Sequence, residues 1–192
     1  FYYLTLMNEN YQHPKRPKNA TPQNIINGAY KFLEAKNPSI RILASGVTLN
    51  FAIQAEKLLS KMNVIAEIWS ITSFNELYKG AIESDRNNRL EIKNSTSHVE
   101  ECFSNEMTTI AVSEYIRSYP NQIRQWVKGD YIVLGTDGFG RSDTREKLRD
   151  HFEINANHIA LNALYSLNMK KEAREFAKSN KIKLDEIAPW LK

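Results

Sequence analysis

The sequence of 192 residues predicts an α/β protein whose mostly parallel sheet is covered by helices on both faces. Two observations lead to this prediction. Short apolar runs rich in β-branched residues alternate with segments of helical periodicity, and those segments are long enough to connect parallel strands. Sheets of this kind collect functional groups at the carboxyl ends of their strands. We therefore expect any site to lie in the loops that follow the apolar runs.

The first 20 residues predict a strand and a linker. Residues 1–7, FYYLTLM, are apolar almost throughout, as is typical of a strand buried on both faces. Because the sequence begins inside this run and without Met, we expect it to be part of a larger chain. Repeated prolines after the run indicate an exposed linker. The candidate linker residues are Asn8, Glu9, Asn10 and Tyr11.

A helix is predicted next. Thr21 is placed to cap it and Pro22 to occupy its first position, and the helix is expected to end near Asn37. Its apolar face would consist of Ile25, Ile26, Ala29, Tyr30 and Leu33.

From residue 39 onward, strands and helices alternate. The predicted strands are residues 39–45, 63–71, 108–113 and 131–135. The predicted helices are residues 47–62, with Thr48 as a cap, a short helix at 72–86, a stretch at 115–127 interrupted by Pro120, and residues 143–152, 155–167 and 170 to about 180. Residues 87–101 show no clear period.

The composition excludes several classes of protein. The 26 Lys and Arg residues are mixed along the chain with 22 Asp and Glu residues, so the net charge of +4 does not indicate a nucleic-acid-binding protein. No apolar run approaches the roughly 18 residues that a membrane helix requires. Cys102 is the only cysteine, which excludes an internal disulfide and indicates a reducing, cytoplasmic compartment. We expect neither nucleic acid nor a membrane as a partner.

A glycine-rich loop after the last predicted strand is the strongest candidate site. Asp143 stands where a dinucleotide-binding motif would need its third glycine, and no Gly-Lys-Ser/Thr follows, so neither known phosphate cradle fits. A structural interpretation is a sharp turn, with Asp143 capping the next helix and Glu146 completing a capping box. It leaves an exposed Phe139 unexplained, together with two arginines able to hold a carboxylate or a partner surface. The candidate residues are Asp137, Gly138, Phe139, Gly140, Arg141, Ser142, Asp143 and Arg145.

The other motifs in the sequence do not indicate a catalytic or cofactor-binding site. The four histidines lie far apart in the sequence and lack a nucleophile in a recognisable context. Ser45 lacks the full nucleophile-elbow motif. Asp137, Gly138 and Asn162 weakly match a magnesium and thiamine diphosphate motif, but Thr136 replaces its first glycine. The residues alone therefore assign no catalytic, cofactor-binding or metal-binding side chain.

Four stretches carry a family resemblance: residues 1–11, 69–77, 113–127 and 134–153. In this order they resemble the carboxyl-terminal region of the homodimeric, bacterial-type pyruvate dehydrogenase decarboxylating component. The resemblance runs from Phe1 to about Leu167. It is interrupted at residues 85–92, where a tryptophan, a histidine and a proline usual in the family are missing.

The resemblance implies a transketolase-like carboxyl-terminal domain. Its fold would have three α/β/α layers and a five-stranded mixed sheet with one antiparallel strand. Residues 1–20 would be the end of the preceding, middle domain and the linker, and residues 21–192 the domain itself. Thiamine diphosphate and Mg²⁺ would bind between two other domains of the parent enzyme, so no catalytic, cofactor or metal residue is expected in this chain.

The resemblance also implies a function for the parent enzyme, which decarboxylates pyruvate and transfers the acetyl group to the lipoyl group of dihydrolipoyl acetyltransferase. For this chain we expect no activity by itself but a structural role, in packing against other domains of the same chain and in the interface with a second subunit of a homodimer. An alternative is a docking module for the acetyltransferase core. A third hypothesis is a regulatory domain that binds a small anion at residues 138–142.

Overall fold

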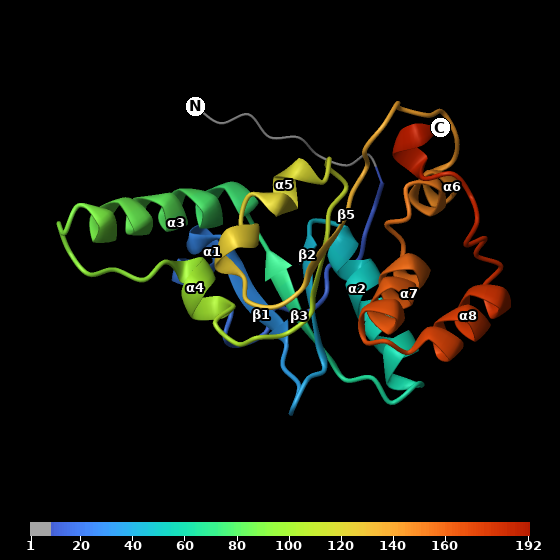
Figure 1. Cartoon of the computed structure of the whole chain (residues 1–192), viewed down its shortest axis with the longest axis horizontal. Helices are drawn as coiled ribbons and strands as arrows, with labels where there is room; N and C mark the ends of the chain where they lie inside the picture. Colours follow the sequence, from blue (N-terminus) through green and yellow to red (C-terminus); the bar gives the residue numbers. More distant parts are fainter. Residues whose placement is uncertain (1–8) are drawn as a thin grey trace.

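The computed structural model describes residues 9–192, in which five strands form one sheet of order β1-β3-β2-β4-β5 (Figure 1). Strand β1 runs antiparallel to β3, and the other neighbouring strands are parallel. The strands are β1 (Ala29–Leu33), β2 (Ile40–Ser45), β3 (Ala66–Ile71), β4 (Thr109–Val112) and β5 (Tyr131–Leu134). The predicted α/β class and the four strands predicted after residue 38 are confirmed. The strand predicted at residues 1–7 lies outside the described residues.

The helix predicted to run from Pro22 to Asn37 is wrong in its second half. Helix α1 (Pro22–Asn27) begins as predicted, with the Thr21 hydroxyl accepting from Asn24 N. It ends at Gly28, whose left-handed φ of 105° stops the helix. The chain then forms β1, because the residues after Gly28 pair with β3. This edge strand is the antiparallel strand that the resemblance implied.

Helices α2 (Thr48–Ser60), α7 (Ala156–Ser166) and α8 (Lys170–Ser179) lie on one side of the sheet (Figure 1). Their apolar faces form one core with alternate residues of β2, β3 and β4. Thr48 was predicted as the cap of α2, and this is wrong. It lies within the first turn, completely buried, and its hydroxyl donates to Ser45 O at 2.7 Å and accepts from Ser45 N at 3.0 Å. The side chain therefore fixes the start of α2 to the end of β2.

The opposite side of the sheet is covered by α3 (Phe74–Arg89) and α4 (His98–Cys102), while α1 packs against β1 and α3 (Figure 1). Helix α3 is longer than the predicted short helix and begins at a Ser73 cap. The stretch without a clear period contains α4, which opens with a capping box of Ser97 and Glu100. The segment around Pro120 forms only α5 (Ser118–Asn121) and the short 3₁₀ helix η1 (Arg124–Trp126).

A buried polar ladder crosses the sheet beneath α4. Glu67 accepts from Arg41 Nε and from Trp69 Nε1, both at 2.9 Å, and pairs with Lys31 Nζ at 3.1 Å. Arg41 is 1% exposed, and its guanidinium lies 5.2 Å from the ring centroid of Phe103. Burial raises the pKa of Glu67, but the three donors outweigh it and hold the pKa below the ordinary 4.5. The ladder therefore joins β1, β2 and β3 through an ionised carboxylate.

The last part of the chain contains α6 (Arg145–His151) and a short 3₁₀ helix, η2 (Pro189–Leu191). Among the described residues, no helix combines the length and apolar character needed to span a bilayer.

Candidate functional site

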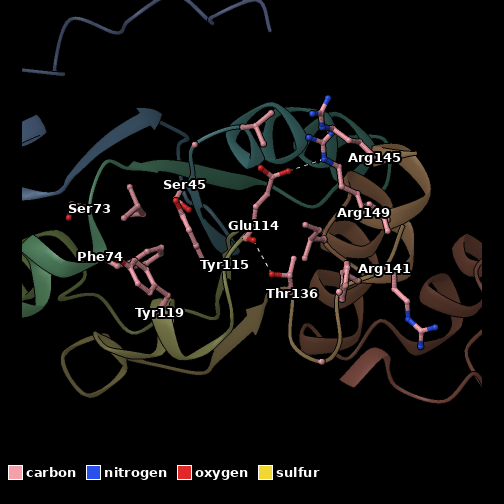
Figure 2. A pocket seen from close by; sticks show the side chains of 18 of the residues that line it. Ser45, Ser73, Phe74, Glu114, Tyr115, Tyr119, Thr136, Arg141, Arg145 and Arg149 are labelled. Atoms are coloured by element: carbon pink, nitrogen blue, oxygen red, sulfur yellow. Dashed lines mark hydrogen bonds and ion pairs between the residues drawn. The ribbon is translucent and has the colours of Figure 1, made fainter. Parts of the chain in front are cut away.

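A cleft of about 910 Å³ opens at the carboxyl ends of β2 to β5, where the α/β topology predicts a site (Figure 2). After β2 the chain adds β3 on one side of this strand and then crosses over to add β4 on its other side. Residues after each strand line the cleft, among them Gly46 after β2, Ser73 after β3, Glu114 after β4 and Thr136 after β5. The cleft therefore lies at the topological switch point of the sheet.

The glycine-rich loop is held firmly at its base. Thr136 donates from its backbone N to Tyr115 O at 3.0 Å and from its hydroxyl to Glu114 O at 2.9 Å. The Asp137 carboxylate accepts from both the backbone N and the Nε of Arg117, each at 3.0 Å. Gly135 is needed here because a Cβ atom would lie 2.7 Å from Tyr115 O. The loop after β5 is thus fastened to the loop after β4.

The carboxyl-terminal segment packs under the same loop. The Arg117 guanidinium lies 3.7 Å from the centre of the Trp190 ring, so this arginine is held between the indole and Asp137. Gly138 has a φ of 100°, and a Cβ there would approach Trp190 Cα to 3.0 Å. The tail and the loop therefore support each other.

Helix α6 is capped differently from the prediction. Thr144, not Asp143, is the N-cap, with its hydroxyl accepting from Lys147 N. The third residue after Thr144 is Lys147, so the predicted capping box with Glu146 cannot form. Asp143 instead accepts from Thr144 N at 2.7 Å and pairs with Lys147.

The tip of the loop faces solvent. Phe139 is 84% exposed, and Gly138, Gly140, Arg141 and Ser142 are exposed as well. The Arg141 side chain points away from Arg145 and Arg149 (Figure 2). Arg141 and Arg145 were expected to hold one carboxylate together, but their side chains do not face a common position.

The structure instead brings Arg145 and Arg149 together on one carboxylate, a pairing that sequence reasoning missed. Both guanidinium groups approach Glu9 Oε2, Arg145 Nη1 at 3.3 Å and Arg149 Nη2 at 3.4 Å. Arg149 also donates to Glu114 Oε1 at 2.9 Å and to the Tyr11 hydroxyl, which in turn donates to Glu9. The spacing of four residues on one helix face was the available signal. The predicted linker residue Glu9 thus meets the predicted loop residue Arg145, while Tyr11 bonds to Glu9 and Arg149.

Charge in this cluster is stabilised by hydrogen bonds. Burial lowers the pKa of Arg149, but bonds with Tyr11 and Glu114 outweigh burial and raise it. The hydrogen bond from Tyr11, followed by the nearby guanidinium charges, holds the pKa of Glu9 below its ordinary value. Both partners are therefore ionised near neutral pH. Of the remaining linker candidates, Asn10 is exposed, and Asn8 lies outside the described residues.

The residues that weakly match a magnesium and thiamine diphosphate motif do not fit that role. Asp137 is occupied by Arg117, and the Asn162 amide donates to His158 O inside α7. In residues 9–192, no group of three or more His, Cys, Asp or Glu side chains could hold a metal ion.

The fold and cleft define a class: an open α/β/α domain with one antiparallel edge strand and a site at the carboxyl ends of its parallel strands. Residues 28–155 match the pattern of the transketolase-like TK C-terminal domain. The chain belongs to this family.

Its relatives include proteins named pyruvate dehydrogenase E1 component. The protein from Pseudomonas aeruginosa is 44% identical over 175 residues, covering 87% of this chain and 20% of the relative. The Escherichia coli K12 protein is 35% identical over 203 aligned positions, covering 100% of this chain and 22% of the relative. The chain spans about a fifth of the length of these relatives.

Solved transketolase structures share the fold. One from Pichia stipitis superposes with a TM-score of 0.58 at 17% identity, covering 83% of this chain and 20% of that one. One from Campylobacter jejuni gives 0.55, also at 17% identity, over 78% of this chain and 20% of that one.

Proposed function

We propose that this chain is the carboxyl-terminal domain of a pyruvate dehydrogenase decarboxylating component, and that its role there is structural. The observation that carries the proposal is the 44% identity with the Pseudomonas aeruginosa protein of that name, which extends over 87% of the chain. Residues 1–20 would be the end of a preceding domain and the linker, and residues 21–192 the domain. The position of α1, which begins at Pro22, supports this boundary.

In this proposal the larger protein works in the cytoplasm, decarboxylates pyruvate, and passes the acetyl group to a lipoyl group of dihydrolipoyl acetyltransferase. Thiamine diphosphate, bound with Mg²⁺ by other domains, supplies the electron sink for decarboxylation. This chain contributes no residue to that step. It provides a packed sheet that holds the loop after β5 in a fixed position.

The loop is the part of the chain that we propose contacts a neighbouring domain or the second subunit of a homodimer. Its base is fixed by Asp137, Arg117 and Trp190, while its tip exposes Phe139 and Arg141. Aromatic and arginine side chains are the types most enriched at protein interfaces. A rigid base under such a tip lowers the entropic cost of forming the contact.

Calorimetry with thiamine diphosphate tests the structural role. The purified chain should bind no cofactor and should not decarboxylate pyruvate, while the complete enzyme does both. Micromolar binding of the cofactor by the chain would contradict the proposal.

The exposed tip also fits a second function, docking to the acetyltransferase core. A pull-down separates the two functions, because only a docking module retains the core on the immobilised chain. The matched control is the Phe139→Ser chain, which should lose retention if the loop is the docking surface.

A further inference from the structure

Four charged side chains at the mouth of the cleft balance one another only while Glu9 is in place. Arg145 and Arg149 carry the positive charges, and Glu9 and Glu114 the negative ones. Both guanidinium groups reach the same oxygen of Glu9, whereas Glu114 pairs with Arg149 alone. If the linker withdraws, one positive charge remains unbalanced beside Arg149, whose side chain is only 11% exposed. A guanidinium pair in such surroundings favours another carboxylate or phosphate.

The adjoining cleft has the size and walls of a small-molecule site. Its volume of about 910 Å³ falls within the range of roughly 300–1,000 Å³ typical of ligand pockets. Aromatic rings of Phe74, Tyr115 and Tyr119 lie on one side, and the two arginines lie on the other (Figure 2). Tyr115 and Tyr119 stack with ring centroids 5.2 Å apart, which presents a flat apolar wall.

We propose that this cleft binds a small organic anion with a flat apolar part, whose carboxylate or phosphate takes the place of Glu9 on Arg145 and Arg149. The guanidinium pair holds the anionic group, and the flat part packs against Tyr115 and Phe74. Ligand binding and attachment of the linker therefore exclude each other. This site differs from the loop backbone at residues 138–142, and it goes beyond the structural role proposed above without depending on it.

A titration of the isotope-labelled chain tests the proposal. Glu9→Gln keeps the shape of the side chain and removes the charge that competes with a ligand. Arginine Nε–H signals report binding of three probes: acetate, inorganic phosphate and benzoate. We expect the variant to bind each anion about tenfold more tightly than the unmodified chain, a difference readily measured as a change in Kd. Benzoate should bind more tightly than acetate, because its ring is buried against the aromatic wall.

Three further variants make the outcome decisive. Arg145→Met in the Glu9→Gln background should abolish binding, whereas Arg174→Met, which removes an exposed arginine on α8, should leave it unchanged. Tyr11→Phe provides an independent way to weaken the linker, since it removes the hydroxyl that bonds to both Glu9 and Arg149. The proposal is overturned if no probe gives a saturable shift in the Glu9→Gln chain. It is equally overturned if Arg145→Met and Arg174→Met bind the probes alike.

Discussion

Arg117 and Trp190 form the contact that joins the end of the chain to the glycine-rich loop. The guanidinium lies 3.7 Å from the centre of the indole ring, and the same guanidinium pairs with Asp137 at 3.0 Å. One arginine therefore connects three segments: the loop after β4, the loop after β5 and the carboxyl-terminal tail. The tail lies outside residues 28–155, the part that matches the family pattern.

Trp190→Ala should loosen the loop without unfolding the sheet. The loss of the cation–π contact should cost about 1 kcal/mol in the free energy of unfolding. Hydrogen exchange at residues 135–143 should become faster, while exchange in β2 and β4 stays slow. The matched control is Leu191→Ala, because Leu191 is 72% exposed. Equal exchange rates in both variants would show that the tail does not support the loop.

Two glycines should respond oppositely to alanine. At Gly28 a Cβ would lie 2.5 Å from Ser73 O, and φ is 105°, so Gly28→Ala should lower the free energy of unfolding by about 1–3 kcal/mol. At Gly140 nothing lies within 4 Å of the added Cβ, and φ is not positive. Gly140→Ala should therefore be neutral or slightly stabilising. Urea denaturation measures both, and a large loss at Gly140 would mean that the loop is more constrained than its contacts show.

The sequence predicted the strands best where apolar runs are flanked by turns. It failed at β1, because Ile25, Ala29 and Leu33 have helical spacing and a single glycine separates the helix from the strand. The antiparallel pairing with β3, which is a tertiary contact, decides the conformation of Ala29–Leu33. Local periodicity carries no information about that pairing.

The candidate site was predicted in part. The loop after β5 and its exposed Phe139 followed from glycine spacing and strand order. The pairing of Arg149 with Glu9 could not be predicted, because the two residues are 140 positions apart and meet only through the fold. The contact of Trp190 with Arg117 could not be predicted for the same reason, since nothing near Trp190 in sequence indicates Arg117 as its neighbour.

Cys102 should be chemically inert in the folded chain. Burial, with a smaller contribution from Glu101, raises the pKa of its thiol from 9.0 to about 12. At neutral pH the thiolate fraction should be about a thousandfold smaller than in the unfolded chain, and only the thiolate reacts. Iodoacetamide should therefore modify Cys102 slowly until urea unfolds the protein. Rapid modification without urea would contradict this prediction.

The polar ladder should make the free energy of unfolding depend on pH in the acidic range. Glu67 has a lowered pKa in the folded chain, so its contribution is fully present above the unfolded value of 4.5 and is lost as the pH falls through the folded pKa. The free energy of unfolding, measured in urea, should decline below about pH 4.5. Lys31→Met removes one of the three donors to Glu67 and should make the decline shallower. Glu76→Gln, which removes a solvent-exposed carboxylate, should keep the original decline.

Arg141→Ala tests the proposed interface in the complete enzyme. Arg141 is exposed at the loop tip and points away from Arg145 and Arg149 (Figure 2), so its removal should not disturb the folded domain. If the tip contacts a neighbouring domain or subunit, truncation should weaken dimer assembly or lower turnover, with a cost of about 1–2 kcal/mol typical of an interface arginine. Arg174→Ala on α8 is the matched control, because it removes the same charge from an exposed position outside the loop. Sedimentation and pyruvate turnover measure both effects. Unchanged dimerisation and turnover in Arg141→Ala would reduce the loop to a turn that serves the fold alone.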